Sequence, residues 1–297
     1  AMPAYTEMQR AADASSSTAH SSGGGSSYCL GVLHVFNMWI GLLCGCCLVV
    51  QAFAAPRSAD TLILCYEDQN SYPWVMTDGS GLNLQLLQLV DATLPLQFTF
   101  VAVPWKRCLS GLAQGTYDGA FASSFKAERL ALGRYPQDVD GRLDERKRLH
   151  TSIYALYRRK GSPVSWNGEE FRQLHGQVGS LSGFSIVDFI RAQGAEVDET
   201  SRDPLALLQM LRHKRIEAAA LQSLRGDFVL KAYPDLATQL EKVKLPLEEK
   251  AYYLMLSNAY VAAHPQQAAD IWNEIEHQRE SVVYQRQVQA FLQRPQP

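Results

Sequence analysis

Positive charge is not in excess in this sequence, because its 28 Lys and Arg residues are balanced by 30 Asp and Glu residues. Nucleic-acid binding depends on concentrated positive charge, so the composition argues against a nucleic-acid partner. Hydrophobic residues make up 46% of the 297 positions, which is enough for one large domain or for two lobes with cores of their own. We therefore expect a globular protein.

The residue patterns of metal sites and of nucleophilic catalysis are also missing. After residue 54 the chain has neither a C-x-x-C pair nor two histidines at ligand spacing, so we expect no metal and no cofactor. It has no G-x-S-x-G motif, the nucleophile elbow of many hydrolases. The histidines after residue 54 lie in polar helix or loop contexts, where we expect solvated side chains: His150, His175, His213, His264 and His277.

Cysteine is scarce in the same part of the chain, where only Cys65 and Cys108 occur. In an oxidising compartment the two can form a disulfide, provided that the strand with Cys65 lies beside the helix with Cys108. Two buried, unpaired thiols are the alternative.

Charged residues are absent from residues 28–54, an apolar stretch that ends in Ala52-Phe53-Ala54. The stretch predicts an export signal cleaved before Ala55, and hence a periplasmic protein. An uncleaved membrane anchor is the alternative, because the stretch is longer than the ~20 residues that span a bilayer. Residues 11–27 are rich in Ser, Gly and Ala, and we expect them to be disordered. Whether the protein starts at Met38 stays open.

From residue 55 onward, predicted strands and helices alternate. Apolar strands are expected at 61–66, 96–104 and 117–123, with helices at 82–94 and 105–115 between them. These connections are long enough for parallel strands, so the pattern predicts an α/β sheet. Ligands bind such sheets at the carboxyl ends of the strands, which places residues 67–74 and 123–129 on one rim.

A second α/β series follows, and the chain then returns to the first. Residues 149–162 form a strand, 177–197 a strand, turn and helix, 203–222 a helix and strand, and 251–257 a strand before two closing helices. We expect lobe 1 at 55–153 and 249–297, and lobe 2 at 154–248, inserted into lobe 1. The crossings between the lobes are expected to be strands near 149–157 and 247–255.

Several stretches occur in an order that resembles a known family. They are "SYPWV", "WKRCLSGLAQGTYDGAF", "AER", "VGSLSGFS", "LLQMLRHKRIEAAAL", "YYLMLS" and "IWNEIEHQRESVVYQ". Because these stretches occur in this order, the chain resembles the periplasmic solute-binding proteins of family 3, which deliver polar amino acids to ABC transporters. The resemblance implies a two-lobed periplasmic-binding-protein-like fold of type II, in which the lobes close on a small carboxylate-bearing molecule. It also implies a monomer that works with an inner-membrane ABC permease.

The resemblance further implies which residues contact the ligand. Arg129 matches the arginine that binds the ligand carboxylate, a role that suits its planar, permanently charged guanidinium. The other expected contacts are the hydroxyls of Ser124 and, next to it, Ser123, the turn Gly183-Phe184-Ser185, the aromatic walls Tyr72 and Trp74, and the acids Glu67 and Asp68. Each has a structural alternative: a helix cap for the serines, lobe packing for the aromatics and a solvated loop for the acids. Trp105 is expected in the core.

Gln222 departs from the family pattern, because amino-acid-binding members have an aspartate there for the ligand ammonium. Glutamine supplies no full charge, and an unpaired buried ammonium is costly. Either Glu67 or Asp68 takes over this role, or the ligand is an amino acid derivative or an organic acid.

Two other functions compete with transport. The first is a periplasmic dehydratase on the same fold, which would use Glu67 or Glu128 as the general acid or base. The second is a ligand sensor tethered by an uncleaved segment at residues 28–54.

Overall fold

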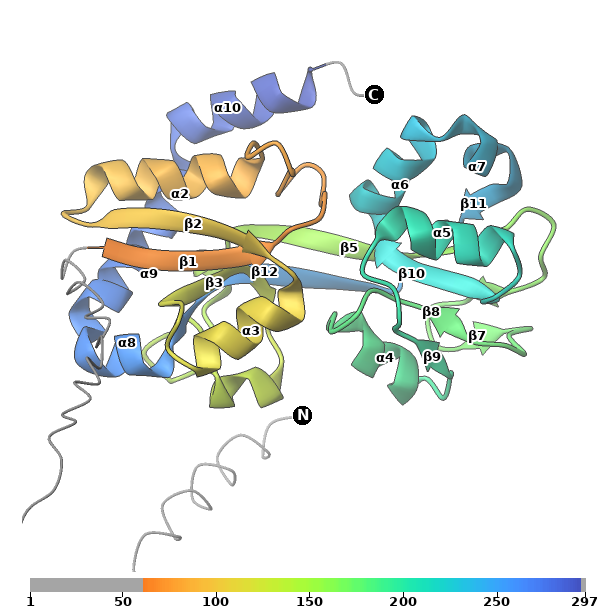
Figure 1. Cartoon of the computed structure of the whole chain (residues 1–297), viewed down its shortest axis with the longest axis horizontal. Coiled ribbons are helices and arrows are strands. Elements are labelled where there is room, and N and C mark those ends of the chain that lie inside the picture. Colours follow the sequence, from red (N-terminus) through yellow and green to blue (C-terminus); the bar gives the residue numbers. More distant parts are fainter. Residues whose placement is uncertain (1–60, 295–297) are drawn as a thin grey trace, which may run out of the picture. The chain divides into compact units, whose positions relative to one another are not determined.

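The computed structural model describes residues 61–294 (Figure 1). The Ser- and Gly-rich stretch, the expected export signal and its cleavage site lie outside the described residues. Within residues 61–294 no helix is long and apolar enough to cross a membrane.

Three parallel strands form the centre of lobe 1. Strand β1 (Thr61–Glu67) lies between β2 (Gln97–Val103) and β3 (Gly119–Ser124). Helices α2 (Leu82–Thr93) and α3 (Trp105–Ala113) connect them, as the alternating pattern predicts. Because the helical connections keep the strands parallel, the carboxyl ends of β1 and β3 lie at one edge of the sheet.

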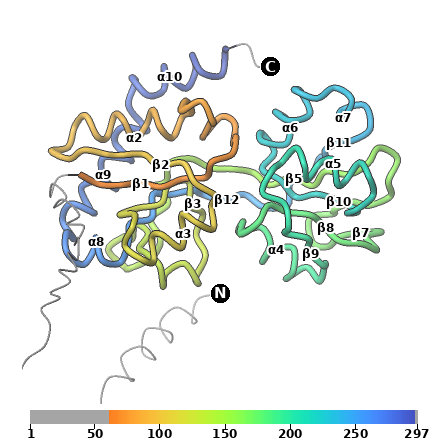
Figure 2. The backbone as a smooth tube through the Cα atoms, viewed as in Figure 1, coloured from red at the N-terminus to blue at the C-terminus, as the bar shows by residue number. Residues whose placement is uncertain are grey.

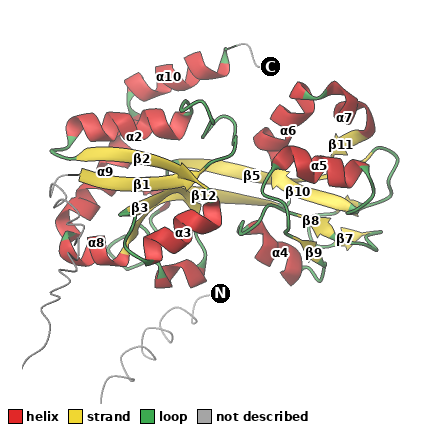
Figure 3. Cartoon of the chain, viewed as in Figure 1, coloured by secondary structure: helices red, strands yellow, loops and turns green. Residues whose placement is uncertain are grey.

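Helices cover both faces of this sheet, as Figure 3 shows. Helix α2 packs with α9 (Pro265–Glu280) and α10 (Val282–Leu292) over one face, where its apolar side chains join a large buried cluster. Helix α3 packs on the other face, where Cys108 and Leu112 meet Cys65 and Tyr253. A disulfide joins Cys65 to Cys108, whose Cα atoms are 5.6 Å apart.

Strands β5 (His150–Arg159) and β12 (Glu248–Ser257) run from lobe 1 into lobe 2 (Figure 2). They pair antiparallel with each other, while β12 also pairs with β3, and β5 with β10 (Ala218–Gln222). The resulting strand order is β2-β1-β3-β12-β5-β10-β8-β9, so one continuous sheet passes through both lobes. The sequence prediction of an α/β fold with two lobes is confirmed.

Lobe 2 has two hydrophobic cores on opposite faces of its strands. Helices α5 (Pro204–Arg212), α6 (Ser223–Ala232) and α7 (Pro234–Gln239) contribute to one, and α4 (Ile186–Ala192) to the other. Its shorter strands are β6 (Ser165–Trp166), β7 (Phe171–Arg172), β8 (Val178–Gly179), β9 (Val197–Asp198) and β11 (Leu240–Lys242). The remaining elements belong to lobe 1: η1 (Ala127–Ala131), β4 (Gly133–Arg134), η2 (Glu145–Lys147) and α8 (Asn258–Ala263).

Candidate binding site between the lobes

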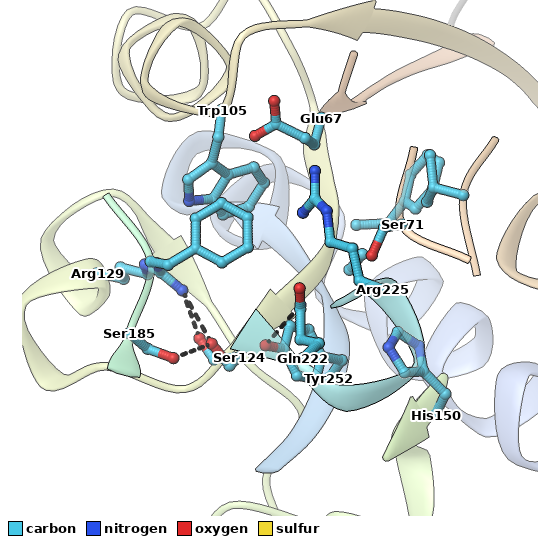
Figure 4. Close-up of a pocket in the computed structure, with 14 residues that line it drawn as sticks. Glu67, Ser71, Trp105, Ser124, Arg129, His150, Ser185, Gln222, Arg225 and Tyr252 are labelled. Atoms are coloured by element: carbon cyan, nitrogen blue, oxygen red, sulfur yellow. Dashed lines mark hydrogen bonds between the residues drawn. The ribbon is translucent and has the colours of Figure 1, made fainter. Parts of the chain in front are cut away.

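A small cavity lies where the lobes meet, at the carboxyl ends of β1, β3 and β10 (Figure 4). Its volume is about 30 Å³, which leaves room for only a few water molecules. The lobes are therefore in contact around it. Its lining is Glu67, Ser71, Val75, Trp105, Phe121, Ala122, Ser124, Arg129, His150, Phe184, Ser185, Gln222, Arg225 and Tyr252.

Arg129 connects the two lobes from η1, the short helix after β3. Its Nη1 donates to the carbonyl oxygen of Ser124 at 2.7 Å, and its Nη2 donates to that of Gly183 in lobe 2 at 3.0 Å. The guanidinium lies over the ring of Trp105, 5.3 Å from its centroid, and only 2% of the residue is exposed. Among the described residues its Nε has no hydrogen-bond partner. The cavity thus holds a buried cation with donor capacity to spare.

Three further polar contacts join the lobes around Arg129. The hydroxyls of Ser124 and Ser185 are 2.7 Å apart and both are buried. Lys126 forms an ion pair with Asp188 of α4 at 2.9 Å. Arg202 of lobe 2 pairs with Asp68, which follows β1, at 3.3 Å. These contacts stabilise the closed arrangement of the lobes.

Glu67 ends β1 at the rim of the cavity. Burial raises the pKa of its carboxyl group to about 7, although the Arg225 charge opposes the shift. Its Oε1 has no hydrogen-bond partner among residues 61–294. Near neutral pH this carboxyl group is therefore only partly ionised.

Arg225 enters the cavity from the first turn of α6. Only 1% of it is exposed, and its guanidinium lies 5.4 Å from the ring centroid of Phe184. Burial lowers the pKa of Arg225, and the nearby Glu67 counteracts this effect. Within the described part of the chain, its Nε and Nη2 have no hydrogen-bond partner. The cavity therefore contains a second guanidinium with donors to spare.

The crossing strands supply a buried network of neutral polar groups. The hydroxyls of Tyr154 on β5 and Tyr252 on β12 are 2.8 Å apart, and Nε2 of Gln222 donates to Tyr252 at 3.1 Å. Burial raises the pKa of both phenols, so both are neutral at ordinary pH. Oε1 of Gln222 has no partner among the described residues. It remains available as an acceptor at the cavity.

His150 corrects the expectation that the histidines are solvated. It is 4% exposed, because on the predicted strand β5 its side chain faces residues of other segments instead of solvent. Its ring lies between Trp74 and Tyr252, with centroids 4.1 and 4.9 Å away, and its Nδ1 is 2.9 Å from Oδ1 of Asn83. Burial lowers the pKa of His150 well below its ordinary value, so the ring is neutral.

The structure brings six of the expected contact residues to the cavity lining: Glu67, Ser124, Arg129, Phe184, Ser185 and Gln222. Gly183 contributes its carbonyl oxygen to Arg129 from outside the lining, and Asp68 pairs with Arg202. Two other expected residues pack elsewhere, since Tyr72 stacks on Phe228 of lobe 2 and Trp74 stacks on His150. Ser123 is buried, with its hydroxyl 2.8 Å from that of Tyr135.

Four further polar residues line the cavity, although the sequence did not single them out as ligand contacts: Ser71, His150, Arg225 and Tyr252. Trp105, expected in the core, belongs to a core cluster and also lines the cavity. A signal existed for Arg225, which lies three residues after Gln222 at a junction of strand and helix. By contrast, Glu128 has a side chain that is 71% exposed, pairs with Lys126 and does not line the cavity.

No cluster of three or more His, Cys, Asp or Glu side chains within residues 61–294 is suited to a metal ion. The site consists of two guanidiniums, one carboxyl group, hydroxyls, a neutral imidazole and an amide. Such a set is suited to hydrogen bonding with an anion.

Solved structures with the same fold exist at low sequence identity. The GluR0 ligand-binding core from Nostoc punctiforme, in complex with L-glutamate, is 16% identical, with a TM-score of 0.61 over 78% of this chain and 100% of that chain. The arginine-, lysine- and histidine-binding protein ArtJ from Geobacillus stearothermophilus is 12% identical, with a TM-score of 0.63 over 80% and 96%. A histidine kinase sensor domain with similarity to periplasmic binding proteins is 16% identical, with a TM-score of 0.64 over 80% and 98%.

No family model matches the chain, and a search of curated proteins finds no significant match. At these identities, the structural neighbours establish the two-lobed fold of periplasmic binding proteins.

Proposed function

We propose that this chain is a periplasmic solute-binding protein that captures a small carboxylate-bearing molecule between its lobes and presents it to an ABC permease. The observation that carries the proposal is Arg129, a buried guanidinium whose hydrogen bonds reach both lobes at the cavity. Structural neighbours with the same fold include a glutamate complex and a protein described as binding basic amino acids, which supports a ligand of this kind.

Closure follows from the chemistry of Arg129. A guanidinium binds a carboxylate through two parallel hydrogen bonds, which are stronger than its bonds to neutral carbonyl oxygens. A ligand carboxylate would therefore replace the carbonyl oxygens of Ser124 and Gly183 as acceptor. Because the cavity volume is about 30 Å³, the lobes must separate to admit such a ligand and close around it afterwards.

The test begins with the ligand. Mass spectrometry of small molecules that co-purify with the protein, followed by calorimetry with those molecules and with a panel of amino acids and organic acids, identifies what binds. Arg129→Ala then removes the charge-assisted hydrogen bonds, and we expect binding to weaken at least about tenfold. Arg134→Ala, which changes an exposed arginine of the same lobe, serves as the control. Unchanged affinity in Arg129→Ala would contradict the assignment.

The dehydratase alternative has one observation in its favour, the raised pKa of Glu67 in the cavity. A carboxyl group with a pKa of about 7 suits general acid or base catalysis near neutral pH. Incubation of the protein with prephenate-like acids tests this alternative. Turnover that is lost in Glu67→Gln would replace the binding function with an enzymatic one.

A further inference from the structure

Arg225 is the feature of the cavity that the proposed role of Arg129 leaves unexplained. It belongs to lobe 2, and its Nε and Nη2 have no acceptor among the described residues although the side chain is buried. In Figure 4 its guanidinium points into the pocket toward Glu67 and Trp105, whereas Arg129 approaches from a different side. Buried donors of a charged group are costly when they lack acceptors, and an anionic ligand would supply acceptors to these two nitrogens.

The charge balance of the cavity also favours an anion. Arg129 and Arg225 contribute two positive charges, and among the described lining residues Glu67 is the only acid. Its carboxyl group, with a pKa of about 7, offsets at most one of those charges. The imidazole of His150 is neutral, and Asp68 and Arg202 at the rim neutralise each other. A ligand with more negative than positive charge restores neutrality.

The cavity is poorly suited to a ligand ammonium group. Gln222 offers a neutral oxygen at the position where the resembling family has an aspartate. Glu67 is then the one possible counter-charge in the described lining, and its burial favours the protonated form. Any α-amino acid would leave its ammonium weakly compensated, and one with an uncharged side chain would also leave one of the two guanidiniums without a carboxylate.

On the premise that the protein binds a solute in this cavity, as proposed above, we propose that its ligand is a small dicarboxylate. Arg129 on lobe 1 binds one carboxylate, and Arg225 on lobe 2 binds the other. Because the two arginines belong to different lobes, a molecule with an anionic group at each end connects the lobes electrostatically. Both ends of the ligand thereby contribute to closure.

Calorimetry with the purified protein tests this ligand class. The titrants are unbranched dicarboxylates from malonate to adipate, monocarboxylates of the same lengths, L-glutamate and L-glutamine. We expect at least one dicarboxylate to bind about tenfold or more tightly than every monocarboxylate, since it gains a second set of charge-assisted bonds.

Two substitutions at Arg225 separate its role in recognition from a role in folding. Arg225→Met removes the charge but keeps a long side chain, and it should remove the preference for dicarboxylates while monocarboxylate affinity stays within about threefold. Arg225→Lys keeps the charge without the planar fork, and it should retain part of the preference. Circular dichroism melts verify that each variant is folded. If Arg225→Met does not fold, the titration series on the unaltered protein and on Arg225→Lys still decides the question.

Glu67→Gln distinguishes a dicarboxylate from an acidic amino acid. Removal of this carboxyl group takes a negative charge away from the neighbourhood of an anionic ligand, so it should tighten glutarate binding, but should weaken any ligand whose ammonium group it compensates. Tighter binding of L-glutamate than of glutarate, weakened by Glu67→Gln, would overturn the dicarboxylate inference.

The failure of each proposal has its own signature. If monocarboxylates or neutral amino acids bind as tightly as dicarboxylates, and Arg225→Met has no selective effect, the solute-binding function stands and the dicarboxylate inference is wrong. If no carboxylic or amino acid binds to the unaltered protein, and Arg129→Ala differs from it in none of the titrations, the proposed function itself is wrong.

Discussion

The protonation state of Glu67 depends on its partly buried position in the cavity. Its pKa is about 7 in the folded protein because burial disfavours the carboxylate, compared with an ordinary value of 4.5. Between these two values the unfolded chain has lost the proton that the folded protein keeps. The free energy of unfolding therefore falls as the pH rises through this window.

We predict that Glu67→Gln removes this loss of stability. Denaturant unfolding at pH values from 4 to 8 measures the free energy of unfolding of both proteins. As the pH rises, the value for the variant should increase relative to that of the unaltered protein, by up to about 3 kcal/mol. Glu128→Gln, which changes an exposed glutamate of the same lobe, is the control and should follow the unaltered protein. Parallel pH profiles for the unaltered protein and Glu67→Gln would show that burial does not shift this carboxyl group.

Strand β1 and helix α3 are joined by the disulfide between Cys65 and Cys108, 43 residues apart in the chain. A cross-link limits the conformations of the unfolded chain, and a loop of this length corresponds to about 4 kcal/mol in the chain-entropy estimate. Both residues are fully buried in the core between the sheet and α3, so reduction requires unfolding.

We predict that a reductant lowers the free energy of unfolding by about 2–4 kcal/mol in equilibrium denaturation. The double variant Cys65→Ala/Cys108→Ala is the matched control, because it keeps every other cysteine and should not respond to the reductant. An equal response in both proteins would mean that the effect comes from outside this pair.

Closure of the protein as a whole depends on contacts between lobe 1 and lobe 2. The crossing strands β5 and β12 hold the lobes together in any state, whereas the pair of Lys126 and Asp188 forms only when the lobes meet. Asp188 is more than half exposed, so the pair is worth at most about 1 kcal/mol, and salt weakens it.

Asp188→Asn should shift the equilibrium toward separated lobes. We predict a larger radius of gyration in solution scattering and a ligand affinity weakened by up to about fivefold, with a smaller effect at high salt. Glu170→Gln breaks an exposed ion pair with Arg172 within lobe 2 and should change neither measurement. If the two variants behave alike, the contact between Lys126 and Asp188 has no part in closure.

Sequence patterns located most elements because those patterns act locally. The apolar spacing of residues 82–94 predicted α2, and the crossing strands were predicted near 149–157 and 247–255. Gln222 was noted because it departs from a family pattern. The polar sequence context of His150 predicted a solvated side chain, and this prediction was wrong. Its burial depends on Trp74 and Tyr252, which come from distant segments.

Hydrophobic periodicity along the chain therefore determined the α/β class, the order of the lobes and the strands that cross between them, because each of these features follows from the side chains of one segment. The predicted strand order already placed Glu67 and Arg129 on one rim, and only the tertiary structure showed that Arg225 shares their cavity, where both guanidiniums are buried and Glu67 is partly buried. Glu67, Arg129 and Arg225 come from separate segments that the crossing strands bring together. Their burial, and the atoms that lack a partner among the described residues, arise from that meeting, because burial depends on side chains that are distant in the sequence.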